Sequence, residues 1–331
     1  MSTRFGEPQL FDSRTTLQPL ALHHGGIVPA PEVAWRLCGA SGAPIVVALG
    51  GISAHRRTHA VDGEAAGWWQ GMVGDGAALD TRHLQVLSFD YLGGWGGSTA
   101  PQVDRPLPAI SPFDQAEVLH QLLAQLRLPR LRAIVGASYG GMVALAFGQR
   151  YPQEVAELAI ISAAERTHPM ATAWRSVQRD TVRFALSQGK GAEGLKLARA
   201  LAMSTYRSPA EFAARFSAAP RFEAGVARFP VEDYLLARGA HYAERYSPAS
   251  FLCLSESIDL HAVDAASISV PTRALGVAED QLVPIADMRA LCARLPRAHL
   301  HEISSLYGHD AFLKETEILR EWLQPLTGET A

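Results

Sequence analysis

Cysteine is scarce in this chain of 331 residues, where only Cys38, Cys253 and Cys292 are present. The three are widely spaced and contain no CxxC pair, which argues against a disulfide framework and against a zinc site. Such cysteine usage is typical of proteins in a reducing compartment. We therefore predict that the protein holds no metal.

The chain also lacks an excess of basic charge. Its 30 Lys and Arg are outnumbered by 33 Asp and Glu, which gives a formal net charge of −3, and the basic residues are scattered. Because nucleic-acid binding depends on a concentrated positive field, DNA and RNA are not expected as partners.

Long apolar runs are absent as well. Residues 1–7 show no charged start followed by an apolar stretch of signal-peptide length, and no later run approaches the length that spans a membrane. We therefore expect no membrane contact and a location in the cytoplasm.

Apolar residues are nevertheless abundant, at 48% of the chain, which is enough to bury a large core in one main domain with an insertion. Short apolar runs at 44–49 and 84–90 end in glycine-rich loops and are typical of strands covered on both faces. A helical pattern at 112–126 is followed by strands at 131–135 and 155–162. This alternation predicts a parallel sheet wound right-handedly.

The pattern differs before and after these elements. Two early strands at 17–22 and 32–38, separated by a His-His-Gly-Gly turn, are expected to form an antiparallel start of the sheet. Between about 165 and 266 the chain shows helical segments broken by prolines. The sheet pattern resumes at 272–277, followed by a helix and a strand at 299–303.

These patterns together predict an α/β fold class, with helices on both faces of a mostly parallel sheet. The core is expected to comprise residues 1–164 and 267–331. Residues 165–266 are expected to form a helical lid inserted over the sheet.

A candidate nucleophile lies where a strand runs directly into a helix. Gly136-Ala137-Ser138-Tyr139-Gly140 matches G-x-S-x-G, the motif of a strained strand-to-helix elbow that needs small neighbours. The strand before it and the helix after it supply the context that the motif requires. Ser138 is therefore predicted as the nucleophile, and a purely structural glycine turn is the alternative.

The partners of such a serine follow in the order acid, then histidine, each in a loop after a later strand. Asp280 comes just after 272–277, and His309 comes after 299–303. His309 would act as general base, and Asp280 would fix its tautomer and stabilise the imidazolium. Glu279 is the alternative acid.

An oxyanion at the acyl carbon needs preorganised donors, which this fold draws from two backbone N–H groups. The candidates are the N–H of Tyr139, directly after the nucleophile, and that of Gly51, in the loop after an earlier strand. A simple turn at Gly50-Gly51 is the alternative. The glycine-rich loop at 93–99 lacks a following Gly-Lys-Ser/Thr, so no phosphate cradle is predicted there.

Several further segments, in order and at matching spacing, resemble the homoserine O-acyltransferase (MetX) family over roughly residues 45 to 325. They are Gly67-Trp68-Trp69, Ala78 to Thr81, Leu92 to Thr99, Gly140-Gly141-Met142, Tyr206-Arg207-Ser208, Val231 to Leu235, and Tyr307 to Leu313. The resemblance implies an α/β-hydrolase fold and a two-step acyl-enzyme route in methionine biosynthesis. It also implies acyl-CoA as co-substrate with no bound cofactor, L-homoserine as acceptor, and a homodimer.

The family's substrate residues map onto three positions of this chain. The segment 198–207 resembles the lid segment whose Arg and Tyr are associated with the amino acid, which points to Arg199 and Tyr206. Asp310 resembles the residue that binds the substrate amine. These types suit a ligand with one carboxylate and one ammonium group. A solvated helix face is the alternative for Arg199.

One departure from the family concerns the acyl donor. Where members commonly have His-Ala-Leu-Thr-Gly, this chain has Leu49 to Ser53, followed by Arg56 and Arg57. An arginine beside the acyl pocket could bind the distal carboxylate of a succinyl group, so succinyl-CoA is favoured over acetyl-CoA, with Arg56 as the first candidate and Arg57 as the second. Contact with CoA phosphates or with solvent is the alternative. An esterase and a non-catalytic binding protein remain as rival functions.

Overall fold

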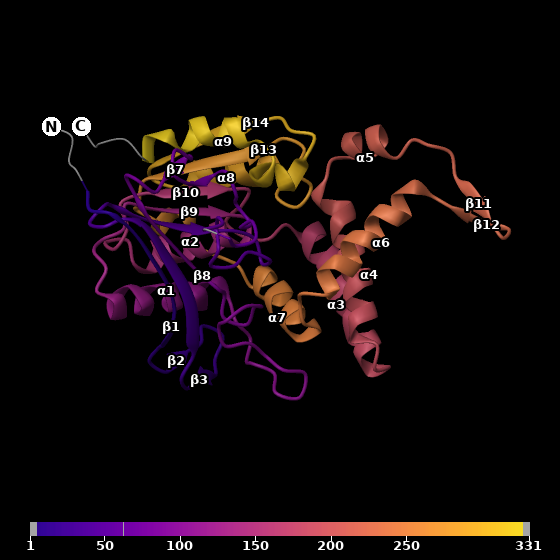
Figure 1. Ribbon diagram of the computed structural model, residues 1–331, viewed down its shortest axis with the longest axis horizontal. Helices are drawn as coiled ribbons and strands as arrows, with labels where there is room; N and C mark the ends of the chain where they lie inside the picture. Colours follow the sequence, from indigo (N-terminus) through magenta and orange to yellow (C-terminus); the bar gives the residue numbers. More distant parts are fainter. Residues whose placement is uncertain (1–4, 62, 327–331) are drawn as a thin grey trace.

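The computed structural model describes residues 5–61 and 63–326 and is built around one twisted sheet of eight strands (Figure 1). The strands across this sheet are, in spatial order, β1 (Pro8–Thr16), β4 (Glu32–Ala40), β8 (Gln85–Phe89), β5 (Ile45–Leu49), β9 (Ala133–Ala137), β10 (Leu158–Ile161), β13 (Thr272–Val277) and β14 (Ala298–Ile303). The β1–β4 and β4–β8 pairs are antiparallel, and every later pair is parallel. The predicted α/β class with a mostly parallel sheet is confirmed.

Helices cover both faces of the sheet. Helices α1 (Pro112–Leu126), α2 (Tyr139–Arg150) and α8 (Ile285–Arg294) contribute to the apolar cluster on one face, and α9 (Thr316–Leu323) contributes to the cluster on the other. Strand β5 shows why both faces must be covered, since its odd-numbered residues join the first cluster and its even-numbered residues join the second.

The chain between β10 and β13, which includes the predicted lid at 165–266, is mainly helical. It contains α3 (Pro169–Ser187), α4 (Gly191–Tyr206), α5 (Pro209–Arg215), β11 (Arg221–Glu223), β12 (Val226–Arg228), α6 (Pro230–Ala243), α7 (Pro248–Asp259) and the 3₁₀ turn η1 (Ala265–Ser267). Proline opens every one of these helices except α4, where its fixed φ suits the first turn. In Figure 1, α3 to α6 stand away from the sheet while α7 lies closer to it.

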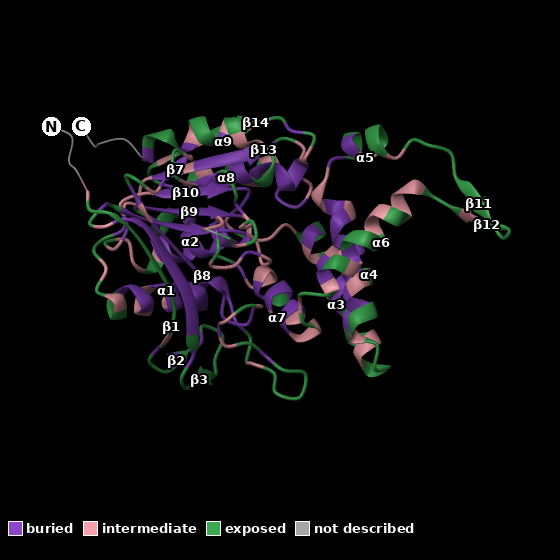
Figure 2. Cartoon of the chain, in the orientation of Figure 1, coloured by how far each residue is buried: buried purple, intermediate pink, exposed green. Residues whose placement is uncertain are grey.

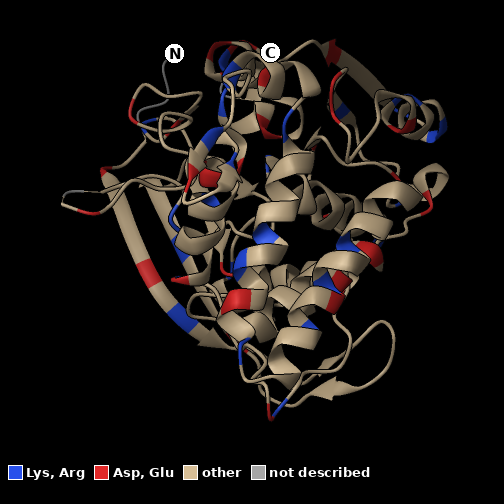
Figure 3. Ribbon diagram, turned by 90° about the vertical axis from the view of Figure 1, so that its right-hand side faces the viewer, with Lys and Arg blue, Asp and Glu red and all other residues tan. Residues whose placement is uncertain are grey.

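The sheet and the end of the insertion differ in how far their residues are buried. Figure 2 shows the strands of the sheet largely buried and the β11–β12 hairpin exposed at the far end of the insertion. Acidic and basic residues are interspersed along the helices that face the viewer in Figure 3. No helix in the described ranges is both long enough and apolar enough to cross a membrane.

The antiparallel start of the sheet differs from the prediction. The segment 17–22 contributes only β2 (Leu20–Ala21), which pairs with β3 (Ile27–Val28) in a separate two-stranded sheet. The partner of β4 is instead β1, which the sequence analysis did not predict. Pro19 lacks a backbone N–H for a ladder, which explains why the apolar segment around it does not form a longer strand.

The remaining elements are short. They are β6 (Val73–Gly74) with β7 (Leu79–Asp80), and the 3₁₀ turns η2 (Gly308–Leu313) and η3 (Gln324–Leu326). Of these, η2 matters most for the site because it carries His309 and Asp310 at the carboxyl end of the parallel strands.

Candidate active site

Ser138 lies at the sharp turn between β9 and α2, with φ 55° and ψ −122°. A non-glycine residue at positive φ is strained, and such strain is typical of an exposed nucleophile at this elbow. The flanking glycines allow the turn, because a Cβ on Gly136 would lie 2.2 Å from the Gly140 carbonyl oxygen. A Cβ on Gly140 would in turn lie 2.4 Å from the Leu49 carbonyl oxygen. Backbone packing thus explains the residue types in the motif.

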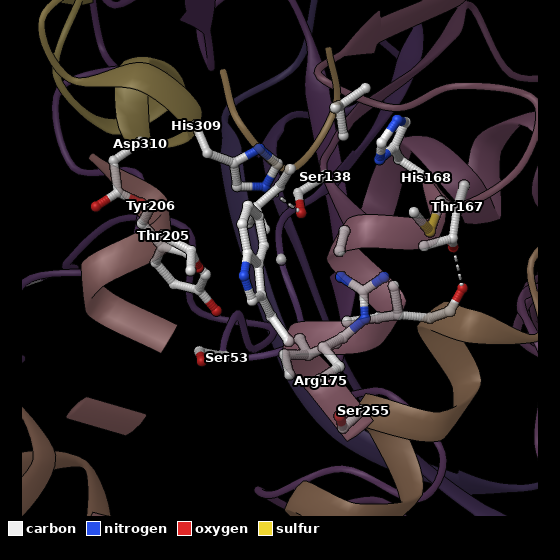
Figure 4. A pocket seen from close by; sticks show the side chains of 18 of the residues that line it. Ser53, Ser138, Thr167, His168, Arg175, Thr205, Tyr206, Ser255, His309 and Asp310 are labelled. Atoms are coloured by element: carbon white, nitrogen blue, oxygen red, sulfur yellow. Dashed lines mark hydrogen bonds between the residues drawn. The ribbon is translucent and has the colours of Figure 1, made fainter. Parts of the chain in front are cut away.

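The structure brings Ser138, His309 and Asp280 together. Figure 4 shows the His309 ring beside Ser138. His309 Nε2 lies 2.8 Å from Ser138 Oγ, and His309 Nδ1 lies 2.7 Å from Asp280 Oδ2. The second oxygen of Asp280 accepts hydrogen bonds from the N–H groups of Leu282 (2.8 Å) and Val283 (3.0 Å), so its carboxylate is held in place.

The alternative acid, Glu279, points elsewhere. Its carboxylate accepts hydrogen bonds from Ser304 Oγ and from the Ser305 N–H, at 2.5 and 2.8 Å. Asp280 is therefore the carboxylate that the fold presents to His309.

The environment of His309 favours a strong base. Burial opposes the charged ring and lowers its pKa, but the negative charge of Asp280 and its hydrogen bond outweigh burial, so the pKa of His309 is raised above its usual value. A higher pKa strengthens the ring as an acceptor of the Ser138 proton.

The Gly51 and Tyr139 N–H groups both lie beside Ser138, and neither donates a hydrogen bond within the described residues. The peptide between Gly50 and Gly51 is held by its carbonyl, which accepts from Gly140 N at 2.9 Å and from Tyr91 Oη at 2.7 Å. In a trans peptide the N–H points opposite to the carbonyl, so these two bonds direct the Gly51 N–H away from Gly140.

A cavity opens in front of Ser138 between the core and the insertion, and it is lined by side chains from both. Figure 4 shows Tyr206 and Asp310 on one side of the His309 ring and Arg175 on the other. The cavity therefore has charged side chains in two regions, one on each side of the His309 ring.

The first region contains Arg199 and Tyr206, as the sequence analysis placed them. The Arg199 guanidinium lies 4.9 Å from the Tyr206 ring centre and 4.8 Å from that of Tyr242, and it donates a 3.2 Å hydrogen bond to Tyr206 Oη. Across residues 5–61 and 63–326, no carboxylate forms an ion pair with Arg199. A partly buried cation lining a cavity without a carboxylate partner is suited to bind an anionic ligand.

Asp310 lies at the same end of the cavity and is largely buried. Its Oδ2 accepts a 2.9 Å hydrogen bond from Arg207 Nε, and Arg207 also pairs with Glu211. Glu211 pairs with Arg215 as well, so the charges of this cluster balance. Asp310 Oδ1 accepts no hydrogen bond from the described residues, so this oxygen can accept one from an ammonium group.

Arg56 does not reach this cavity, which corrects the expectation based on its place in the sequence. Its guanidinium pairs with buried Asp90 and with Asp12, both at 2.7 Å. Arg57 is about half exposed and lies 3.6 Å from Asp12. Both side chains are held by carboxylates of β1 and of the loop after β8, which proximity along the chain could not reveal.

The sequence analysis missed Arg175, which lies in the second region of the cavity (Figure 4). Its Nε and Nη2 donate to Asp259 Oδ1, while Arg179 donates to Asp259 Oδ2. Two guanidinium groups therefore share one carboxylate and leave net positive charge. One feature of the sequence could have identified Arg175. It lies four residues before Arg179 in a predicted helical segment, and this spacing places both arginines on one helix face.

No group of three or more His, Cys, Asp or Glu suited to a metal ion occurs in the part of the chain that the structure describes. The three cysteines are unpaired with one another.

Comparison with known proteins places this arrangement in a family. Residues 44–316 match the α/β-hydrolase fold family. Homoserine O-succinyltransferase of Xanthomonas campestris pv. campestris is 44% identical over 304 residues, covering 90% of this chain and 80% of that protein. Homoserine O-acetyltransferase of Chlorobium chlorochromatii is 29% identical, covering 92% of this chain and 91% of that protein.

Among solved structures, homoserine O-acetyltransferase from Bacillus anthracis superposes with a TM-score of 0.89. The match covers 97% of this chain and 98% of that one at 17% identity, and at this identity it shows a shared fold. Sequence and structure agree, and the chain belongs to the homoserine O-acyltransferase family of α/β-hydrolase-fold proteins.

Proposed function

We propose that this protein transfers an acyl group from acyl-CoA to the hydroxyl of L-homoserine through an acyl-Ser138 intermediate. The observation that carries the proposal is the cavity itself, in which Ser138 lies near the Asp310 carboxylate and near Arg199, a cation with no carboxylate partner in the described residues. An ordinary esterase has no need of this pair, whereas an α-amino acid needs both.

In the first half-reaction, His309 takes the Ser138 proton while Oγ attacks the thioester carbonyl. The carbon–sulfur bond breaks, and CoA leaves as a thiol with the proton from His309. In the second half-reaction, His309 removes the proton of the homoserine hydroxyl, whose oxygen attacks the acyl carbon. The bond between the acyl carbon and Ser138 Oγ then breaks, and His309 returns the proton to Oγ. The Gly51 and Tyr139 N–H groups would stabilise the oxyanion in both steps.

A thiol-release assay tests this function against the esterase alternative. Purified protein is given succinyl-CoA or acetyl-CoA, with and without L-homoserine, and with L-serine in a parallel reaction. We expect sustained CoA release, beyond one equivalent per active site, only when homoserine is present, together with O-acylhomoserine as product. Equal release with and without the amino acid would instead identify a hydrolase.

The acceptor residues give a specific prediction. Arg199→Ala and Asp310→Ala should each lower kcat/KM for homoserine by about ten- to a hundredfold, because each removes one charge-assisted contact. Acyl-enzyme formation should persist, so rapid mixing should show a burst of CoA release followed by slow turnover. Arg183→Ala, an exposed arginine of α3 paired with Asp180, is the matched control. Unchanged use of homoserine in a variant would remove that residue from the acceptor site.

We also propose succinyl-CoA as the preferred donor, with Arg175 in the role first expected of Arg56. Arg175 and Arg179 together carry one more positive charge than Asp259 neutralises. Arg175 Nη1 donates to no group in the described residues, so it is available to a ligand in the cavity. The distal carboxylate of a succinyl chain would satisfy this charge, and an acetyl group would not.

Replacing Arg175 therefore changes the choice of donor. Arg175→Gln should reduce the ratio of kcat/KM for succinyl-CoA to that for acetyl-CoA by about ten- to a hundredfold. Arg56→Gln, the matched control outside the cavity, should leave this ratio unchanged even if both rates fall. A parent enzyme that prefers acetyl-CoA, or a ratio unaffected by Arg175→Gln, would refute the assignment.

The proposal extends to a cytoplasmic homodimer in methionine biosynthesis. Large apolar side chains are exposed on the insertion at Phe184, Leu197, Phe222 and Val226, on α3, α4 and the β11–β12 hairpin. A second copy of the chain could cover such a surface.

A further inference from the structure

A side chain of the insertion contacts the loop that carries Gly51. Tyr246, between α6 and α7, donates a 2.7 Å hydrogen bond from its hydroxyl to the Ser53 carbonyl. Trp95 donates to the same carbonyl at 3.2 Å. Ser53 lies inside the turn closed by the hydrogen bond from Ala54 N to Gly51 O, so this contact links the insertion to the turn that contains Gly51.

Tyr246 is suited to this role because its hydroxyl remains a donor. Burial raises the pKa of Tyr246 to about 12, so the group stays protonated at neutral pH. Its ring is fixed as well, at 4.7 Å from the ring of Trp95.

The same tyrosine is connected to the acceptor region by stacked rings. The Tyr246 and Tyr242 ring centres lie 3.9 Å apart with planes 4° from parallel, and Tyr242 in turn contacts the Arg199 guanidinium. Arg199 contacts Tyr206, whose ring centre lies 5.9 Å from that of His309. Tyr206, Arg199, Tyr242 and Tyr246 therefore contact one another in series.

We propose that Tyr242 and Tyr246 are positioning residues that couple occupation of the acceptor site to the geometry of the Gly51 loop. The inference rests on the proposed function, in which Arg199 binds the acceptor carboxylate. Binding of that carboxylate fixes the guanidinium, which orders the two stacked tyrosines and strengthens the hydrogen bond to Ser53. The oxyanion donor is then held more firmly when an amino acid occupies the site, so the acyl-enzyme loses its acyl group faster with the acceptor bound than without it.

L-2-Aminobutyrate can occupy the acceptor site without accepting the acyl group, because it has the carboxylate and ammonium groups of homoserine but no hydroxyl. It therefore shows the effect of site occupation alone. Acyl-enzyme formed from succinyl-CoA is freed of excess donor, and its hydrolysis is followed as release of free succinate. In the parent protein, 2-aminobutyrate should accelerate hydrolysis by about fivefold or more. Tyr246→Phe keeps the ring but removes the hydrogen bond, so the acceleration should disappear while KM for homoserine stays within about twofold of the parent.

Two further variants complete the test. Tyr242→Leu breaks the stack and should both abolish the acceleration and raise KM for homoserine. Tyr151→Phe, the matched control, removes a hydroxyl that donates to Glu117 and should respond as the parent does.

The outcomes distinguish this inference from the proposed function. Slower or unchanged hydrolysis of the parent with 2-aminobutyrate, or full acceleration in Tyr246→Phe, overturns the coupling. A parent that forms no acyl-enzyme, or does not pass the acyl group to homoserine, overturns the proposed function instead.

Discussion

Ser138→Ala should reduce acyl transfer by about 10⁶-fold, because no covalent intermediate can then form. The fold should be retained, since alanine is smaller than serine and the turn is defined by the backbone packing of Gly136 and Gly140. Turnover with succinyl-CoA and homoserine measures the loss, and circular dichroism with thermal unfolding checks the fold.

The chain offers a matched control for this substitution. Ser162 also follows a buried strand, has a positive φ of 49° and is buried, but it lies at the end of the neighbouring strand β10. Ser162→Ala should retain activity. If Ser138→Ala kept more than a trace of turnover, the nucleophile would have to be sought elsewhere.

Asp280→Asn should lower kcat by about 10⁴-fold, as in serine-protease triads, because the asparagine cannot hold the imidazole in the required tautomer or stabilise its charge. The backbone bonds from Leu282 and Val283 can still be accepted by the amide oxygen, so the loop should keep its shape. Glu279→Gln is the comparison, since its partners are Ser304 and Ser305. A larger loss in Glu279→Gln would mean that the acid was misassigned.

The same substitution should change the pH dependence in a defined direction. In the parent, the raised pKa of His309 places the acid limb of kcat/KM above the ordinary histidine value, and activity is lost as the pH falls through it. Asp280→Asn removes the negative charge that raises this pKa. The residual activity should therefore show an acid limb at lower pH than in the parent, and a shift to higher pH would contradict the account.

The core of the site could be predicted from the sequence because its elements are local and ordered. Ser138 is identified by glycines within two residues of it, and Asp280 and His309 lie in the loops that follow strands β13 and β14. Parallel strands end at one edge of the sheet, so residues that follow separate strands meet there. The distances of 2.7 and 2.8 Å in the triad arise from this topology.

Strand β1 was not predicted because its residues show no alternation of buried and exposed side chains. All but one of its nine residues are exposed, including Leu10 and Phe11, so neither face shows the alternation that identifies a half-buried strand. Its pairing with β4 depends on backbone hydrogen bonds along a sheet edge, and these leave little trace in side-chain type.

The sequence could not show which arginine reaches the cavity, because the positions of Arg56 and Arg175 depend on carboxylates far away along the chain. Arg56 follows the oxyanion loop closely, yet Asp12 and Asp90 hold it away from the cavity. Arg175 lies far along the chain on a lid helix, yet the fold brings it beside Ser138. The predicted boundaries of the lid at 165–266 also remain a prediction.

The central claim is that Ser138 carries the acyl group between CoA and homoserine, and mass spectrometry of the intact protein tests it most directly. After brief incubation with succinyl-CoA alone, the protein mass should rise by one succinyl group, and peptide mapping should locate it on Ser138. Adding L-homoserine should remove the added mass and yield O-succinylhomoserine in equal amount. A protein that turns over without becoming acylated, or an acyl group that homoserine does not discharge, would contradict the account.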